Sequence, residues 1–351
     1  MKLPAFLALL MCAPLASAGE DSEAAVSAFV ANPASVRFLL QAEQYEKLES
    51  TLAAIELGTK GRYDREDIWW AAFSFLAQPR PENARRYDDW LALMPGSPYA
   101  RLARAKFLER QGWRVRGNQR VSRTDPSQFE AMAGYHVQAR REYAAIVEKD
   151  PGNLLAYEGL IFLCLADGGA DCSARWLRQA LVRDPGSFNL RAAHMWGLKP
   201  RWGGSYEAMD AFARESQEAA PRNPRLRHLL GSADADRAST AGQREGWSEA
   251  IELYDQALKH GREAAFLADR AFAYLSDRKP LLALADIREA RSLSPAGWFF
   301  SDHGLARTMS LEGLLVHGEG DKERGCELAE RATQLDVDVP ALPGCGGIPQ
   351  P

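Results

Sequence analysis

Four cysteines in the central and C-terminal parts of the sequence are the residues best suited to covalent or metal chemistry. They are Cys164, Cys172, Cys326 and Cys345, while a fifth, Cys12, lies near the N-terminus. No C-x-x-C or C-x-x-H pair occurs, so their spacing does not fit a zinc site. An even number of cysteines is typical of disulfide bonds in an oxidising compartment. We therefore predict two disulfides and no metal or cofactor, with four free thiols as the alternative.

Motifs for catalysis are not found in the sequence. It contains no G-x-S-x-G, P-loop, H-E-x-x-H or glycine-rich dinucleotide fingerprint, and none of its six histidines pairs with another at helical spacing. The formal net charge of −4 and the pI of about 6.0 do not indicate a nucleic-acid binder. The sequence thus predicts a protein that is not an enzyme and has no nucleic-acid partner. An enzyme whose site is assembled from dispersed residues is the alternative.

The N-terminal segment 1–18 has the pattern of a secretory signal. Lys2 is followed by a short apolar run from Leu3 to Leu15 and by the small-x-small site Ala16-Ser17-Ala18. We predict cleavage after Ala18 and a periplasmic or secreted product with no transmembrane segment. An uncleaved anchor and lipidation at Cys12 are the alternatives.

A turn motif that occurs twice gives the clearest information on the fold. Lys149–Asn153 reads KDPGN and Arg183–Ser187 reads RDPGS. Before three prolines, small and bulky residues recur at spacings that place them on one face of a helix. These positions are Ala139, Tyr143 and Ile146 before Pro151, Ser173, Leu177 and Ala180 before Pro185, and Ala283, Ile287 and Ala290 before Pro295. Small residues let antiparallel helices approach while bulky ones fill the space beside them, so the pattern predicts stacked helix pairs.

We therefore predict an all-α fold, a right-handed α-solenoid of stacked antiparallel helix pairs with an irregular N-terminal half. The expected parts are a signal peptide (1–18), an irregular helical region (19–127), the repeats (128–338) and a C-terminal tail (339–351). Two abutting domains divided near residue 125 are the alternative.

Segments 139–185 and 264–295 resemble the tetratricopeptide repeat family. The interval from Pro151 to Pro185 equals the period of that family. The segments depart from it where Ile161 and Ala271 replace the usual glycine of the first helix. The resemblance implies a scaffold that binds a protein or peptide. Residues 90–225 also resemble an uncharacterised family of bacterial helical-repeat domains, through Trp113–Gly117 and Pro200–Ser205, and this adds support for the fold alone.

Resemblance to tetratricopeptide stacks also implies that the first helix of each pair lines a concave groove. Phe162 and Phe272 stand at the same offset before Pro185 and Pro295, and Trp196 follows Phe162 by one period. Such aromatic residues suit the binding of an extended peptide. We expect these residues, with Trp202 near the rim, to form the partner site of a scaffold in the cell envelope. In the alternative, the rings pack against neighbouring helices or the tail fills the groove.

Helix geometry suggests how the cysteines pair. Cys164 ends the first helix of one pair and Cys172 opens the second, so an antiparallel arrangement brings them together. Cys326 lies on the last helix and Cys345 in the tail, which a bond between them would hold over the end of the stack. We predict the pairs Cys164–Cys172 and Cys326–Cys345.

Basic residues gather between Arg101 and Arg123, where eight cations stand against one acid, Glu109. A charge run of this kind is usually a solvated helix face with intramolecular partners, which we expect here. An acidic polymer or acidic partner is the alternative. Pro200–Ser205, with two glycines beside Trp202, is expected to be a structural corner, or alternatively a loop that lines the groove.

Overall fold

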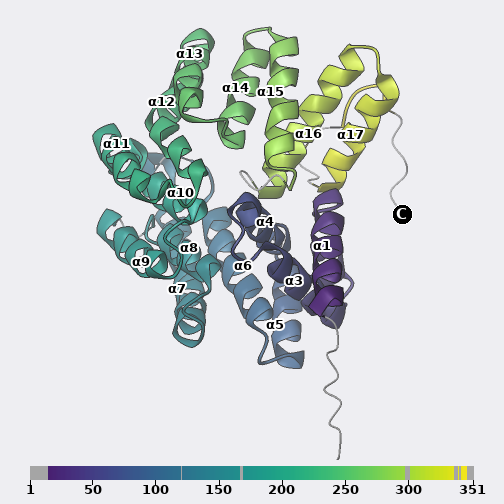
Figure 1. Ribbon diagram of the computed structural model, residues 1–351, viewed down its shortest axis with the longest axis vertical. Helices are drawn as coiled ribbons and strands as arrows, with labels where there is room; N and C mark the ends of the chain where they lie inside the picture. Colours follow the sequence, from purple (N-terminus) through teal and green to yellow (C-terminus); the bar gives the residue numbers. More distant parts are fainter. Residues whose placement is uncertain are drawn as a thin grey trace, which may run out of the picture.

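The computed structural model describes residues 15–119, 121–166, 169–296, 301–335, 339 and 341–345. Within these ranges every regular element is a helix (Figure 1). The predicted all-α solenoid is the observed fold. Residues 1–14 of the predicted signal lie outside these ranges, and a helix begins at Leu15, ahead of the predicted cleavage site.

The N-terminal region forms a group of helices without a regular repeat. Their bounds are α1 (Leu15–Ala31), α2 (Ser35–Gln41), α3 (Tyr45–Thr59), α4 (Glu66–Leu76) and α5 (Asn83–Leu93). Helix α4 is the most buried of them and contacts helices far along the chain as well as its neighbours α2 and α3. The irregular half is thus packed into the solenoid.

The remaining helices form the stack. They are α6 (Pro98–Arg116), α7 (Pro126–Lys149), α8 (Leu154–Leu163), α9 (Ala170–Arg183), α10 (Phe188–Gly197), α11 (Tyr206–Glu215), α12 (Ser232–Gly242), α13 (Trp247–Ala257), α14 (Ala264–Ser276), α15 (Pro280–Leu293), α16 (Ser301–Gly318) and α17 (Lys322–Leu335). Short 3-10 turns connect them or precede them: η1 (Tyr63–Arg65), η2 (Val121–Arg123), η3 (Pro200–Trp202), η4 (Ser216–Ala219), η5 (Pro224–Gly231) and η6 (Leu258–His260). Helices α6 and α7 pair across the boundary predicted at residue 127.

The stack bends so that its last helices meet the first. In Figure 1, α7 to α17 follow an arc from the lower left over the top to the right, where the lower end of α17 reaches the upper end of α1. Arg331 of α17 donates a hydrogen bond to the backbone carbonyl of Ala31 at the end of α1. One buried cluster joins residues of both ends, among them Phe29, Leu160 and Leu328.

The repeated DPG turn is explained by local hydrogen bonds. The Asp150 carboxylate accepts a bond from the Gly152 amide at 3.0 Å, and Asp184 does the same for Gly186 at 2.9 Å. The last residue of the motif then caps the next helix, since Asn153 accepts from the Ala156 amide and the equivalent Ser187 caps α10. The motif therefore ends one helix and starts the next.

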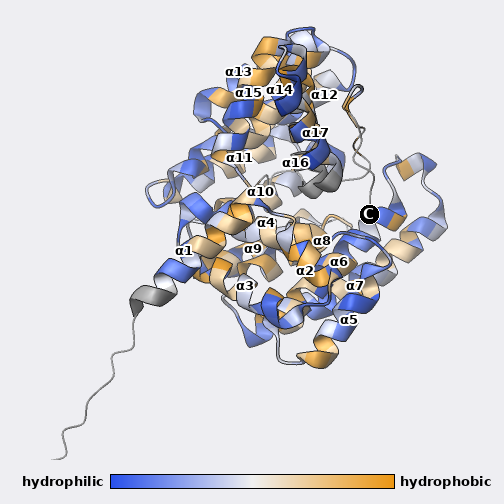
Figure 2. Ribbon diagram, turned by 90° about the vertical axis from the view of Figure 1, so that its right-hand side faces the viewer, coloured by the Kyte–Doolittle hydropathy of each residue, from blue (hydrophilic) through white to orange (hydrophobic). Residues whose placement is uncertain are grey.

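Close approach of helices α7 and α8 depends on Gly159. A Cβ atom at this position would lie 2.2 Å from the ring of Tyr143. The fully buried Tyr143 is the bulky residue of the predicted pattern, and α8, coloured largely hydrophobic in Figure 2, packs against it. A small residue thus faces a bulky one, as the pattern predicts, although glycine stands two positions before Ile161.

The start of α4 is attached to the start of α10. The Glu66 carboxylate accepts hydrogen bonds from the backbone amides of Phe188 (3.0 Å) and Asn189 (3.2 Å) and from the Ser187 hydroxyl. These amides belong to the first turn of α10, where backbone N–H groups have no hydrogen-bond acceptor within the helix. Burial raises the pKa of Glu66 to about 7, although the Ser187 hydrogen bond opposes the rise.

Arg225 reinforces this junction. Its guanidinium bonds the carboxylates of Asp67 (2.7 Å) and Glu263 (3.1 and 2.8 Å), and it lies 4.0 Å from the centre of the Phe188 ring. Burial alone would raise the pKa of Glu263, but Arg225 and His228 together lower it to about 2. The arginine thus joins η5 to α4 and to the residue that precedes α14.

The cysteines are paired as predicted. Cys164 and Cys172 have Cα atoms 5.7 Å apart, and Cys326 and Cys345 have Cα atoms 5.3 Å apart, both within the range of disulfides. His317 lies beside the second pair, with its ring nitrogen and the two sulfur atoms all within 4.8 Å of one another. Because those sulfurs are bonded to each other, they are not available as thiolate ligands.

Within the described part of the chain, no helix combines the length and apolar character that crossing a membrane requires.

Replacing both Cys326 and Cys345 by serine should lower the free energy of unfolding by roughly 2 to 3 kcal/mol, because the closed loop no longer restricts the unfolded chain. Urea unfolding would measure this change. The matched double variant at Cys164 and Cys172 should lose a similar amount. Four thiols that react with Ellman's reagent in unreduced, unfolded protein would contradict both pairings.

Replacing Glu66 by alanine should destabilise the fold by about 1 to 3 kcal/mol, since three donors lose their acceptor. The folded-state pKa near 7 lies above the ordinary value of 4.5, so wild-type stability falls as the pH rises between these values. The effect of Glu66→Ala should therefore be largest near pH 4.5 and shrink towards pH 7. Urea unfolding across this range tests it, with the exposed Glu46→Ala as control; equal stability of wild type and Glu66→Ala at the acid end would refute the capping role.

Candidate functional site

A cavity of about 590 Å³ opens on the concave side of the stack. We call it the groove cavity. Its walls come from α6, from the first helices α8, α10, α12 and α14, from the turn η3, and from α4 of the N-terminal region. The aromatic residues that line it are Trp113, Phe162, Phe188, Trp196, Trp202 and Phe266. The charged residues that line it are Lys106, Glu109, Arg110, Glu158, Lys199, Arg201, Asp236, Glu263 and Asp269.

Three of the four aromatic residues predicted for the partner site meet in this cavity. Phe162, Trp196 and Trp202 all line it, and Trp196 remains 38% exposed. The expectation of a ladder that includes Phe272 needs correction. Phe272 is not among the lining residues and stays 45% exposed, with its ring edge-on to that of Trp247.

The register of α14 explains the displacement of Phe272. This helix presents Phe266 and Asp269 to the cavity, whereas α8 presents Glu158 and Phe162. The cavity thus meets α8 towards its C-terminal end and α14 near its start. Phe272 lies about one helical turn beyond Asp269, past the end of the cavity.

Helix α6 supplies a wall that the sequence analysis did not foresee. Lys106, only 6% exposed, forms an ion pair with Glu158 of α8 at 2.5 Å. Glu109 accepts a hydrogen bond from the Tyr143 hydroxyl at 2.7 Å. Burial raises the pKa of Glu158, with Lys106 opposing that shift. Charges at the buried positions of a helix were the available signal, because they need partners from other helices.

Part of the basic run has partners within the molecule, as expected for such a run. Arg101 and Arg104 both pair with Glu142 of α7, at 2.8 and 2.6 Å. Arg110 donates a hydrogen bond to the backbone carbonyl of Ser74 in α4 at 2.6 Å. These contacts connect α6 to the helices on either side of it.

The corner at Pro200–Ser205 is both structural and part of the cavity. Gly203 has a φ of 89°, and a Cβ at Gly204 would lie 2.1 Å from the carbonyl oxygen of Leu198, so both positions require glycine. The corner holds Trp202 at the cavity wall, where its ring lies edge-on to Trp113 at 5.8 Å. The segment is therefore a structural corner and also lines the cavity.

Cations cover part of the aromatic surface. The Lys199 ammonium lies 3.7 Å from the centre of the Trp196 ring and pairs with Asp236 at 3.2 Å. Arg201 also pairs with Asp236, and all three residues line the cavity. Burial lowers the pKa of Lys199, while Asp236 opposes the shift. One carboxylate thus holds two cations against the tryptophan.

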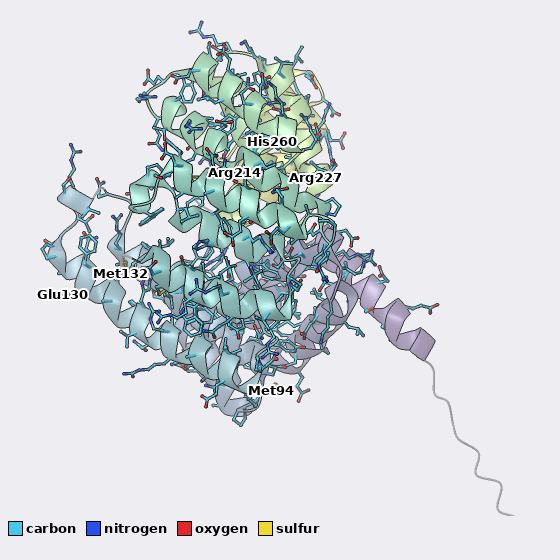
Figure 3. All side chains as sticks on the ribbon, turned by 60° about the vertical axis from the view of Figure 1, so that its left-hand side comes forward. Met94, Glu130, Met132, Arg214, Arg227 and His260 are labelled. Atoms are coloured by element: carbon cyan, nitrogen blue, oxygen red, sulfur yellow. A yellow bond between two sulfur atoms is a disulfide. The ribbon has the colours of Figure 1, made fainter. Side chains whose placement is uncertain are left out.

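A second cavity of about 660 Å³ lies beyond Glu263, which lines both cavities. Residues around Tyr63 to Ile68 and the turns before η5 and α14 surround it. Arg227 and His260, labelled in Figure 3, belong to its wall. Pro295 and Ala296 also line it.

No protein-family model matches the chain, and a search of curated proteins finds no match. Solved structures do match it. MamA has a TM-score of 0.25 and 16% identity, covering 61% of this chain and 95% of its own. The APC/C hetero-tetramer Cut9-Hcn1 has a TM-score of 0.36 and 13% identity, covering 92% of this chain and 56% of its own. A tetratricopeptide repeat protein from Parabacteroides merdae has a TM-score of 0.30 and 14% identity, covering 91% and 95%.

The fold is tetratricopeptide-like. The interval between the two DPG turns, which equals one repeat period, and the helix pair α8 and α9 between them support this from the chain itself.

One serine–histidine contact lies elsewhere in this tetratricopeptide-like stack. The Ser173 hydroxyl lies 2.8 Å from His194 Nδ1, and both residues are buried. Burial lowers the pKa of His194 to about 4. Neither residue lines the two cavities, and the Ser173 hydroxyl also bonds the Ala170 carbonyl. The contact therefore joins α9 to α10 as part of their packing.

Replacing Lys106 by methionine should destabilise the protein by about 3 to 5 kcal/mol, because Glu158 is left buried without its cation. The double variant Lys106→Met/Glu158→Met should recover much of that loss, since it removes both charges. Urea unfolding measures the cycle, with the exposed Lys149→Met as control. A single variant as stable as this control would show that the pair does not hold α6 against α8.

Proposed function

We propose that this protein is an exported scaffold that holds a segment of a protein or peptide partner in the groove cavity. The observation that carries the proposal is the convergence of Phe162, Trp196 and Trp202 on one open cavity. They come from two successive first helices and the corner between repeats. Helix α6 adds Trp113, whose ring lies edge-on to that of Trp202, so that a bound segment would meet aromatic residues of more than one helix.

The composition of the walls supports a peptide as the occupant. Binding sites of this kind are mostly apolar, with a few polar groups that fix orientation, and about 590 Å³ lies within their usual range. Trp196 has exposed ring surface for a partner to cover. Tryptophan residues in such positions often carry a large share of binding energy.

Location outside the cytoplasm belongs to the same proposal. The predicted signal with cleavage after Ala18 would export the chain, and the two cysteine pairs are compatible with an extracellular or periplasmic setting. A partner in the cell envelope would then meet the groove cavity directly.

Replacing Trp196 by alanine should reduce partner capture by tenfold or more, because a central aromatic contact is lost. The wild-type chain, exported in its own host and immobilised, would be compared with Trp196→Ala in pull-downs from envelope extract followed by mass spectrometry. Phe272→Ala is the matched control, since Phe272 is an exposed aromatic outside the cavity. Circular dichroism checks that both variants fold. Equal recovery of each captured protein by wild type and Trp196→Ala would reject the groove cavity as the site.

A further inference from the structure

Most charged groups in the walls of the groove cavity already have partners within the protein. Lys106 pairs with Glu158, Arg110 with the Ser74 carbonyl, and Glu109 with Tyr143. Asp236 holds both Lys199 and Arg201, and Glu263 is bound by Arg225 and His228. These groups therefore satisfy one another and do not require a ligand.

Asp269 is the exception. Its carboxylate lines the cavity from the first half of α14, and among the described residues none forms a hydrogen bond or ion pair with its side chain. The cation that acts on it most strongly, Lys199, is already held by Asp236 and the Trp196 ring. Burial raises the pKa of Asp269 to about 7, with Lys199 and Arg307 opposing the shift.

One aromatic residue of the same helix accompanies this carboxylate in the cavity wall. Phe266 lies three residues before Asp269 on α14, so the two share one face of the helix, and both line the cavity. Long basic side chains bury their methylene stems along apolar surfaces while their charged ends reach a polar partner. An unpaired acid beside an aromatic ring is complementary to such a side chain.

We propose that the occupant of the groove cavity is a peptide segment with a lysine or arginine side chain, whose charged end pairs with Asp269 while its stem packs on Phe266. This proposal rests on the proposed function and adds the chemistry of the partner. Charge complementarity selects the cation, because Asp269 has no direct ion pair among the described residues and a positive group brought to it would form one.

A phage-displayed library of random dodecapeptides, selected on the wild-type chain, tests the two proposals separately. The expected result is a set of binders that share a basic residue at one aligned position. If no peptide binds, the proposed function fails. If the binders share no basic position, or if spermidine alone competes for the site as well as the peptides do, the partner chemistry proposed here is wrong.

Synthetic forms of the strongest binder then locate the contact. Exchange of the basic residue for norleucine or citrulline should weaken binding tenfold or more, as measured by fluorescence polarisation. The Asp269→Asn variant should bind the original peptide as weakly as the wild type binds the neutral peptide. It should also bind the original and the neutral peptide with the same affinity. Asp171→Asn, an exposed acid at the start of α9, is the matched control. An Asp269→Asn variant that binds the basic peptide as tightly as wild type would overturn the assignment.

The comparison of basic and neutral peptides stays valid whatever Asp269→Asn does to folding, because that comparison uses the wild-type protein alone.

Binding of the basic peptide should also weaken as the pH falls below about 7, since protonation removes the charge of Asp269. Lys199, Arg307 and Tyr254 interact electrostatically with this carboxylate, and the Asp269→Asn comparison separates their titration from that of Asp269. Affinity for the basic peptide that is independent of pH would count against the proposal.

Discussion

The ion pairs of the partly buried Arg225 are the interaction on which the shape of this molecule depends. Its guanidinium bonds two carboxylates that lie far apart in sequence, Asp67 at the start of α4 and Glu263 before α14. A charge in this position is stable only while both partners stay in place, since a buried ion without a counter-ion is strongly disfavoured. The positions of α4, η5 and α14 relative to one another are therefore fixed together.

This constraint changes the concave side of the solenoid. A tetratricopeptide-like stack by itself would leave that side open, but here α4 lies there, and Glu66 and Arg225 hold it against α10 and the start of α14. What remains is a cavity bounded by the N-terminal helices on one side and by the first helices of the repeats on the other. The N-terminal part thus acts as a wall that narrows the groove.

Local patterns made the repeat predictable. The DPG turn contains its own hydrogen bonds, so its sequence alone indicates where one helix ends and the next begins. The Cys164–Cys172 pair followed from helix ends that must meet, and the Cys326–Cys345 pair from a tail that lies over the end of the stack. The contacts of Lys106 and Glu66 could not be derived in this way, because their partners Glu158 and Phe188 lie far along the chain. Phe272 was expected in the partner site because it occupies the same position in its repeat as Phe162. The repeat period predicts that position, but it does not predict which part of each helix lines the cavity.

The pairing of charges distinguishes residues that hold the fold together from residues that are available to bind a partner. A chain with 26% charged residues must neutralise most of those it buries, and the sequence shows only that acids and bases are nearly balanced. Once each partner is assigned in space, the ion pairs of α6, η3 and η5 are accounted for by the fold. A carboxylate such as that of Asp269, which packing places at the groove without a partner, adds nothing to the stability of the stack. Its unpaired state is therefore informative about binding, whereas the more conspicuous run of arginines in α6 reflects how the helices are held together.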